Sequence, residues 1–420
     1  MIATSLLHAG QSGTAPCQLA ILATHPIHYQ IQLFKRLAQI TGLDVTVLFC
    51  SRFGLSRETD HTCGIVHQWY DDAILDGLPH KFLPNYSWEP SPASIFGTMN
   101  PGVLRELKSG RYDVLLVQGY AGLTEWLALA TAKRAFCPVL FRGETGRRPG
   151  PADTRDVIRK MILKALARTV DVFLPIGTRS REFYLHYGIP RDRLVLSPYA
   201  VDNDFFCGQA RLLQKKRPEF RAALGIDPAV PVVLYLSKMT ARKRPMDLLL
   251  AFEKLQKPAF LLFVGDGPLK IEIQRYVNQR KLKNVLCVGF QNQDNVSRFY
   301  CIGDIFVLPS EYEPWGLVVN EAMCFSLPVL TTNGVAASSD LIQDNGFLYD
   351  AGDTHTLAAL LRELVERQEQ RSTMGRRSRA IIQDWNVNAS VDGICRGIEK
   401  VISAKDGRVV PINSVACDES

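Results

Sequence analysis

The sequence contains ten cysteines but no Cys-x-x-Cys pair. Cysteines scattered in this way indicate neither a zinc site nor a disulfide framework, and they favour a reducing compartment. No apolar run approaches the length that a membrane span requires. Residues 1–8 lack the basic region and the long apolar core of a signal peptide. We therefore expect a cytoplasmic protein that touches a membrane, at most, from its surface.

Internal repeats and low-complexity tracts are also missing, which leaves ordinary globular domains. The formal net charge of +7 is mild. The basic residues are not interleaved with stacking aromatics, so nucleic acid is not an expected partner. No Asp-x-Asp motif stands in a loop suited to a metal ion. We expect neither a metal nor another bound cofactor.

The length of the chain predicts two domains. A chain of 420 residues is too long for one core, and a hydrophobic content of 46% is ample for two. We place a first domain at residues 15–205 and a second at 231–385, with a polar linker or linking helix at 206–230. The tails 1–14 and 405–420 are expected to be mobile.

Short apolar runs that precede loops and helix-like segments recur along the chain and predict a parallel α/β architecture. The predicted strands are residues 19–23, 113–117, 138–141, 172–175, 194–198, 232–236, 260–264, 284–290 and 304–309. In open α/β folds, ligands bind at the carboxyl edge of such strands. The loops that follow the strands are therefore the segments in which to look for a site.

The loop after the last of these strands carries two glutamates, Glu313 and Glu321, separated by seven residues. An apolar pattern beginning at Leu317 predicts a helix there, so the backbone around Trp315, Gly316 and Leu317 can offer N–H groups to an anion. Carboxylates would repel a phosphate, and their expected work is to accept hydrogen bonds from neutral hydroxyls. A nucleotide sugar, with a diphosphate between two polyols, satisfies both requirements.

This pattern resembles the E-x7-E motif of retaining glycosyltransferase family 4, which has the GT-B fold. The resemblance implies two Rossmann-like, doubly wound domains that face each other across a cleft, the first on the acceptor side and the second binding the nucleotide sugar. It also implies a C-terminal helix, at residues 386–404, that crosses back to the first domain. In the family pattern Glu313 would hold sugar hydroxyls and Glu321 the ribose hydroxyls. Two acidic residues that merely flank a turn are the alternative.

Further motifs in the second half resemble the same family. After the strand at 232–236, Ser237 and Lys238 stand where the family has Gly-Arg, and Lys243 has the family's spacing. The resemblance implies that the two lysines stabilise the diphosphate. Lysine keeps the charge of arginine but loses its bidentate fork. A solvated basic turn is the alternative.

Two other loops of the second half complete the predicted donor site. Gly265 lies in a Gly-Asp-Gly-Pro turn that is mainly architectural in the family. Phe290, after the strand at 284–290, resembles the edge that binds the nucleobase.

The first half is less similar to the family. His25 and His28 follow the first predicted strand and suit hydrogen bonds to sugar hydroxyls or phosphate; they could instead satisfy the end of a helix. Arg142 and Glu144 are acceptor-side candidates, with a structural ion pair as the alternative. Gln118 stands where many relatives have a histidine that contacts the donor sugar.

A basic segment lies between the predicted strands of the first half. Arg147 and Arg148 precede a predicted helix with further cations and five apolar positions. The cations are Arg155, Arg159, Lys160, Lys164 and Arg168, and the apolar positions are Val157, Ile158, Met161, Ile162 and Leu166. Such a helix can lie on anionic lipid, or it can cover a sheet with one solvated face.

The sequence thus favours a retaining glycosyltransferase that moves a sugar from a nucleotide sugar to a glycan or to a lipid-linked glycan. Synthesis of cell-surface polysaccharide or glycolipid is the expected setting. Two other functions share the fold: a nucleotide-sugar epimerase, and a protein that binds nucleotide sugars without turnover. In the family the leaving phosphate helps to deprotonate the acceptor, so no protein nucleophile is expected.

Overall fold

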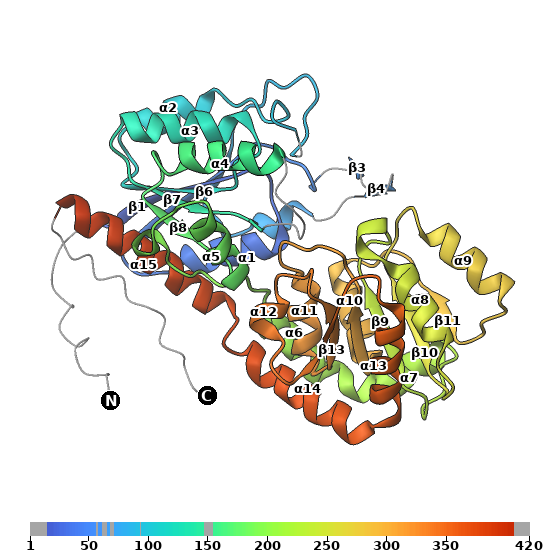
Figure 1. Cartoon of the computed structure of the whole chain (residues 1–420). Helices are drawn as coiled ribbons and strands as arrows, with labels where there is room; N and C mark the ends of the chain where they lie inside the picture. Colours follow the sequence, from blue (N-terminus) through green and yellow to red (C-terminus); the bar gives the residue numbers. More distant parts are fainter. Residues whose placement is uncertain are drawn as a thin grey trace, which may run out of the picture.

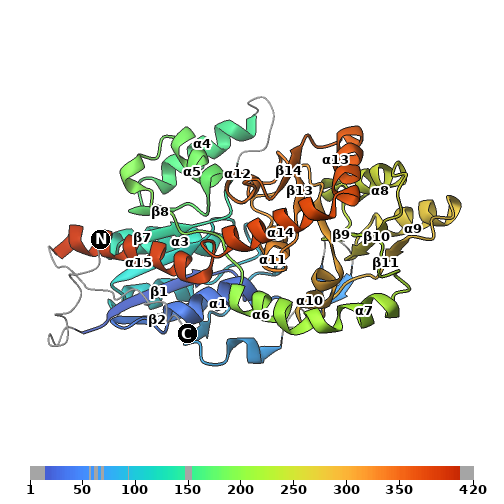
Figure 2. The same ribbon diagram turned by 90° about the horizontal axis from the view of Figure 1, so that it is seen from below.

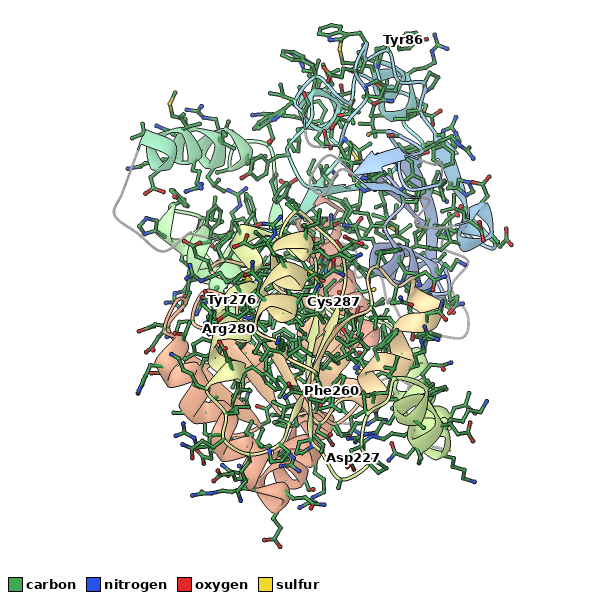
Figure 3. The ribbon with its side chains drawn as sticks, turned by 90° about the vertical axis from the view of Figure 1, so that its right-hand side faces the viewer. Tyr86, Asp227, Phe260, Tyr276, Arg280 and Cys287 are labelled. Atoms are coloured by element: carbon green, nitrogen blue, oxygen red, sulfur yellow. The ribbon has the colours of Figure 1, made fainter. Side chains whose placement is uncertain are left out.

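The computed structural model describes residues 15–55, 58–60, 65–67, 71–92, 94–146 and 154–406. The tail at 1–14, residues 407–420, and Arg147 and Arg148 lie outside this part of the chain. Two α/β domains, each built around a six-stranded parallel sheet, lie side by side (Figure 1). Figure 3 shows Tyr86 at the outer end of the first domain and Asp227 at the outer end of the second.

The first sheet has the strand order β5-β2-β1-β6-β7-β8. Its strands are β1 (Cys17–Ala23), β2 (Leu43–Phe49), β5 (His80–Phe82), β6 (Val114–Gln118), β7 (Val139–Arg142) and β8 (Val172–Leu174). In the central strand, Leu19 pairs with Val45 of β2 and with Val114 of β6. These strands are nearly continuous apolar runs because helices cover both faces of a parallel sheet.

The helices of the first domain are α1 (His28–Leu37), α2 (Gly102–Lys108), α3 (Leu123–Arg134), α4 (Thr154–Leu166) and α5 (Thr178–His186), with short 3-10 turns η1 (Asp72–Leu75) and η2 (Arg191–Arg193). A separate antiparallel pair is formed by β3 (Glu58–Asp60) and β4 (Ile65–His67). The buried residues of α1 are Ile31, Leu33, Phe34 and Leu37, the spacing of one apolar helix face.

The predicted strand at residues 194–198 is wrong. The segment runs beside β8 but forms only an isolated bridge, between Leu194 and Phe173. Val195 and Ser197 donate their N–H groups to Phe173 and Pro175. Pro175 has no N–H with which to return a bond, so the ladder stops.

The second sheet has the order β11-β10-β9-β12-β13-β14. Its strands are β9 (Val232–Leu236), β10 (Phe260–Val264), β11 (Val285–Cys287), β12 (Ile305–Leu308), β13 (Val329–Thr332) and β14 (Gly346–Tyr349). Its helices are α8 (Pro245–Glu253), α9 (Lys270–Gln279), α10 (Gln293–Ile302), α11 (Leu317–Cys324), α12 (Ser338–Leu341), α13 (Thr354–Glu366) and α14 (Gln368–Ile382), with the turn η4 (Ala241–Lys243).

The segment between the sheets is helical: α6 (Asn203–Leu213), η3 (Gln214–Lys216) and α7 (Arg217–Ala223). The Asp202 carboxylate caps α6 by accepting a hydrogen bond from the N–H of Phe205. The buried residues Phe206 and Cys207 of α6 join the apolar core of the second domain. This segment is therefore packed on the second domain.

The last helix, α15 (Val387–Asp406), returns to the first domain. Its buried residues Val391, Ile394 and Ile398 belong to the same core as β1 and α1. Figure 2 shows α14 and α15 following each other along the side of both domains. The chain therefore crosses between the domains twice, before α6 and before α15. In the described part of the chain, no helix combines the length and the apolar character needed to cross a membrane.

Candidate active site

Glu313, in the loop after β12, is the centre of a charged cluster at the carboxyl edge of the second sheet. Its Oε1 accepts hydrogen bonds from Arg242 Nη1 at 3.0 Å and from Lys243 Nζ at 2.5 Å. Glu313 is only 6% exposed. Burial lowers the pKa of the Lys243 ammonium, and the Glu313 carboxylate opposes that shift. A buried carboxylate with two cations on one oxygen is held in a fixed position.

The cations come from the loop after β9, the neighbouring strand, so two adjacent strand ends supply the cluster. Arg242 also donates to the carbonyl of Tyr312 at 2.6 Å. Lys238 lies in the same loop and acts with Arg242 to lower the pKa of Lys243, although burial and the two effects of Glu313 are larger. Three cationic side chains around one carboxylate leave the site positive, as an anionic ligand requires.

The helix N-terminus beside this cluster depends on glycine. Gly316 is the N-cap of α11 and has a φ of 103°, in the left-handed region. A Cβ at this position would lie 3.1 Å from Val335 and 3.3 Å from Leu308. No described side chain caps α11, so the first N–H groups of the helix, at Leu317 and Val318, can serve an anion.

Trp315, by contrast, turns its side chain inward and is 2% exposed. Its Nε1 donates to Asn320 at 2.9 Å, and its ring stacks on Trp385 with centroids 5.2 Å apart. Any contact of Trp315 with a donor therefore has to come from its backbone. The side chain instead packs beside the segment through which α14 leads into α15.

Gly265 has an architectural place, because a Cβ there would lie 2.1 Å from the carbonyl oxygen of Ser237. Glycine thus lets the loop after β10 pack directly against the loop after β9. Phe290 follows β11, farther along the same edge of the sheet, and is partly buried. The structure thus lines up the predicted donor residues Ser237, Gly265 and Phe290 at consecutive strand ends.

Glu321, on α11, accepts a hydrogen bond from the hydroxyl of Tyr300 at 2.6 Å. Burial raises the pKa of Glu321 to about 7, and the hydrogen bond from Tyr300 opposes this shift. Glu321 therefore titrates close to neutral pH. Tyr300 belongs to α10. It could not be identified from the sequence, because its partner Glu321 is twenty-one residues away.

Across from these loops, the first domain has a pocket of about 460 Å³ at the carboxyl ends of β6 and β7. Gln118, Arg142 and Glu144 line it. The Nε2 of Gln118 is buried and has no hydrogen-bond partner among the described atoms. A buried amide without a partner is costly, which favours a ligand hydroxyl as the acceptor.

Arg142 and Glu144 do not pair with each other within the described residues. The buried Arg142 guanidinium donates to Ser197 Oγ and Ser390 Oγ, both at 3.2 Å, and so ties β7 to the interdomain segment and to α15. Glu144 accepts hydrogen bonds from the hydroxyls of Tyr29 and Tyr199. Arg142 thus has structural partners, whereas Glu144 is held by two phenols at the edge of the pocket.

The predicted histidines have a separate environment. Burial lowers the pKa of His25 to about 4, so its ring is neutral at pH 7. Its Nδ1 lies 2.9 Å from Thr24 Oγ1, and its ring contacts Phe53 edge-on. His28 begins α1. Neither histidine lines the pocket that contains Gln118.

Side chains of the two domains join the pocket to the Glu313 cluster. Tyr312 donates its hydroxyl to the carbonyl of Gly146 at 3.1 Å, and Asn320 donates to the carbonyl of Tyr199 at 3.1 Å. Thr178 binds Asp340 through both its N–H and its hydroxyl. These contacts tie the loop of Glu313, α11 and α12 to the first domain beside the pocket.

Several of these contacts could not be assigned from the sequence. Arg242 could have been found, because it stands in the basic run that contains Lys238 and Lys243 and that was predicted to bind the diphosphate. Asn320 and Tyr199 had none, since their roles depend on pairing between distant segments.

Residues 216–381 match the family model described as glycosyl transferases group 1. The sulfoquinovosyl transferase SQD2 of Arabidopsis thaliana is 25% identical over 340 residues, which are 79% of this chain and 64% of that protein. The N-acetyl-alpha-D-glucosaminyl L-malate synthase of Bacillus anthracis is 30% identical over 184 residues, 43% of this chain and 48% of that protein. The chain thus spans about half to under two thirds of the length of these relatives.

Solved structures with a similar fold include Alr3699/HepE of Anabaena in complex with UDP, at a TM-score of 0.68 and 16% identity, covering 92% of this chain and 100% of that one. A glycosyltransferase of Rickettsia africae has a TM-score of 0.71 at 16% identity, covering 93% and 99%. The predicted fold is confirmed: the chain has the GT-B fold, and its second domain matches the group 1 glycosyltransferases.

Proposed function

We propose that the protein is a retaining glycosyltransferase, of the family 4 type, that uses a nucleotide-sugar donor. The observation that carries this proposal is the buried Glu313 carboxylate, held by Arg242 and Lys243 beside the uncapped N-terminus of α11. Cations and helix N–H groups suit the donor diphosphate, whose leaving group gains charge in the transition state. The similarity to a sulfoquinovosyl transferase supports sugar transfer, and the similarity to Alr3699/HepE, solved with UDP, supports a nucleotide as part of the donor.

In this proposal each carboxylate binds hydroxyl groups. Glu313 accepts hydrogen bonds from the transferred sugar, and Glu321 from the ribose. The buried Gln118 amide supplies a donor for the sugar or for the acceptor, in the position where relatives carry histidine. The leaving phosphate takes the acceptor proton, and the facing domains exclude water from the donor. Arg242, Lys243 and Lys238 carry the diphosphate charge, so activity should survive excess EDTA.

The donor can be identified by a thermal-shift screen of nucleotide sugars. A ligand at a hundred times its dissociation constant stabilises the folded state by about 2.7 kcal/mol. The best donor is then incubated with hydroxyl acceptors, and the anomeric configuration of the product is read by NMR. Transfer with retained configuration is expected. Formation of a free epimer would assign the protein to the epimerases, and binding without turnover would make it a binding protein.

A second part of the proposal concerns the acceptor. We infer that α4 rests on anionic lipid and brings a lipid-linked acceptor to the cytoplasmic face of a membrane. Val157, Ile158 and Met161 are 62%, 57% and 68% exposed on α4, instead of covering the sheet. Lys160 and Lys164 are exposed on the same helix. Apolar side chains bordered by lysines match the headgroup region of an anionic bilayer.

One predicted member of this basic surface has another role. Arg159 is bound to Asp156 at 3.1 Å, and Asp156 also accepts a hydrogen bond from Tyr187. Its charge is therefore compensated within the domain. The side chain of Arg155 lies outside the described part of the structure.

A further inference from the structure

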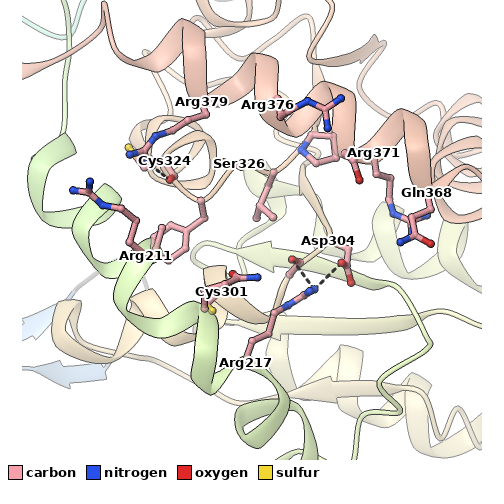
Figure 4. A pocket seen from close by; sticks show the side chains of 17 residues that line it. Arg211, Arg217, Cys301, Asp304, Cys324, Ser326, Gln368, Arg371, Arg376 and Arg379 are labelled. Carbon is pink, nitrogen blue, oxygen red and sulfur yellow. Dashed lines mark hydrogen bonds and ion pairs between the residues drawn. The ribbon is translucent and has the colours of Figure 1, made fainter.

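A second pocket, of about 780 Å³, lies in the second domain and is shown in close-up in Figure 4. Its wall includes Asp304 and Pro328, the residues that immediately precede β12 and β13. Because the strands are parallel, this is the amino edge of the sheet, whereas Glu313 and Lys243 lie at the carboxyl edge. The proposed donor site and this pocket are therefore separate.

The pocket is rich in guanidinium groups. Arg211 and Arg217 come from the segment between the domains, and Arg371, Arg376 and Arg379 come from α14. Among the described residues that line the wall, Asp304 is the only acidic one. Figure 4 shows the five arginines around the hollow and the ion pair between Arg217 and Asp304. Five cations against one carboxylate leave a strong positive excess.

Three of the five arginines bind other parts of the protein. Arg217 binds Asp304 at 2.6 Å, Arg371 donates to the carbonyl of Val365 at 2.9 Å, and Arg379 donates to the carbonyl of Cys324 at 2.7 Å. Burial lowers the pKa of Arg371; Asp304 opposes this shift and Arg217 adds to it. Their contacts fix these side chains, which keep further N–H donors in the planar fork that suits phosphate.

The other two arginines make few contacts with the rest of the protein. Arg211 makes no hydrogen bond or ion pair within the described residues, and Arg376 donates only to Thr373 of its own helix, at 3.0 Å. They stand on α6 and α14, two elements that meet at this pocket. These two guanidiniums with unused donors line the same hollow as the three fixed ones, and together the five suit an anion with several negative oxygens.

We infer that this pocket binds a phosphorylated ligand with at least two negative charges. Its volume accommodates a diphosphate with an attached organic group, and Ser326 and Ser372 in the wall add hydroxyl donors. A purely solvated basic face would explain the charge but not its convergence on one hollow from three elements, α6, α7 and α14.

The position of the pocket suggests what a ligand would do there. α6 follows the first crossing of the chain between the domains, and α14 precedes the second. An anion bound by Arg211 and Arg376 would join these two helices to each other. It would also contact the C-terminal end of α11, the helix whose other end faces the proposed donor site.

The test uses inorganic pyrophosphate, titrated into the full chain by calorimetry. The double variant Arg211→Gln/Arg376→Gln removes the two guanidiniums whose loss breaks no contact between elements. We expect the dissociation constant for pyrophosphate at this pocket to rise by at least about tenfold. Arg362→Gln, on the exposed face of α13, makes the same change outside the pocket and should leave binding unchanged.

Pyrophosphate can also occupy the proposed donor site, so the variant Lys243→Gln is titrated in parallel. Binding that persists in Lys243→Gln and is weakened in the double arginine variant supports the pocket. Equal affinity of the parent and the double arginine variant would overturn it, as would loss of all binding in Lys243→Gln alone. The proposed transfer reaction has no part in this measurement, so the two proposals can fail separately.

A second titration, with vesicles that contain phosphatidic acid, distinguishes the sources of the phosphate. If the double arginine variant loses affinity for pyrophosphate alone, the ligand is a soluble phosphorylated compound. If it loses affinity for both probes, the pocket also accepts a lipid headgroup. Unchanged affinity for both contradicts the inference.

Discussion

At the scale of single residues, Lys243 has a demanding position, since its side chain is only 12% exposed and is bound to Glu313 at 2.5 Å. We predict that Lys243→Gln lowers turnover roughly 10²-fold, because removal of a charge that stabilises the leaving diphosphate costs that order in rate. Arg242 is more exposed, and Arg242→Gln should have a smaller effect. Steady-state kinetics with the identified donor measure both.

Lys283→Gln is the matched control, since Lys283 is exposed in the second domain. It should keep parental turnover. A folded Lys243→Gln protein with parental turnover would show that the diphosphate charge is stabilised by other groups.

Glu321 makes stability depend on pH. Its pKa is raised from 4.5 to about 7 by burial, so the folded state holds a proton that the unfolded state has lost between these values. The resulting stabilisation is complete below pH 4.5 and disappears as the pH rises through 7. Its full size is on the order of 3 kcal/mol. We predict that the free energy of unfolding of Glu321→Gln does not fall over this pH range.

Urea unfolding of the parent and of Glu321→Gln across this pH range measures the difference. The exposed Glu311 provides the control Glu311→Gln, whose profile should follow the parent. Parallel curves for the parent and Glu321→Gln would mean that the Glu321 carboxyl is no harder to ionise in the folded protein.

At the scale of secondary-structure elements, α4 exposes three large apolar side chains next to one another. Such a patch is typical of a surface that contacts a membrane or another molecule. We predict that Val157→Ser/Ile158→Ser/Met161→Ser weakens binding to vesicles of phosphatidylglycerol by at least about tenfold, because apolar burial and lysine attraction both support the contact. The protein should remain folded, since these side chains are already exposed. Vesicle co-sedimentation measures the change.

Ile271→Ser is the control for α4, because Ile271 is 67% exposed on α9 of the other domain. Its vesicle binding should equal that of the parent. If the triple serine variant also binds as the parent does, α4 is an ordinary surface helix.

Elements with one dominant cause could be predicted from the sequence. The run at 232–236 is buried on both faces and forms β9 at those bounds, and Gly316 allows the turn into α11. The strand predicted at 194–198 failed because Pro175, a residue of the neighbouring segment, removes a ladder bond. Contacts between distant segments were also out of reach: Tyr300 with Glu321, and Arg142 with Ser390.

At the scale of the whole molecule, the first domain is built from both ends of the chain. Ile394 and Ile398 of α15 are fully buried against the core that contains β1 and α1. We predict that Ile394→Ala and Ile398→Ala each lower the free energy of unfolding by about 2–5 kcal/mol. Hydrogen exchange should show lost protection in β1 and α1, far away in the sequence.

Ile271→Ala, at an exposed position, should leave stability within about 0.5 kcal/mol of the parent. If exchange instead increased in β9 and β10 while β1 stayed protected, α15 would belong energetically to the second domain.

The return of α15 to the first domain also determines the order in which the two domains can fold during synthesis. β1 and α1 leave the ribosome well before α15, the helix that completes their core. The second domain, from β9 to α14, is contiguous and can close while α15 is still inside the exit tunnel. Domains normally fold from the N-terminus during synthesis. Here the first domain to emerge finishes after the second, and its apolar groove stays open to chaperones until α15 has been synthesised.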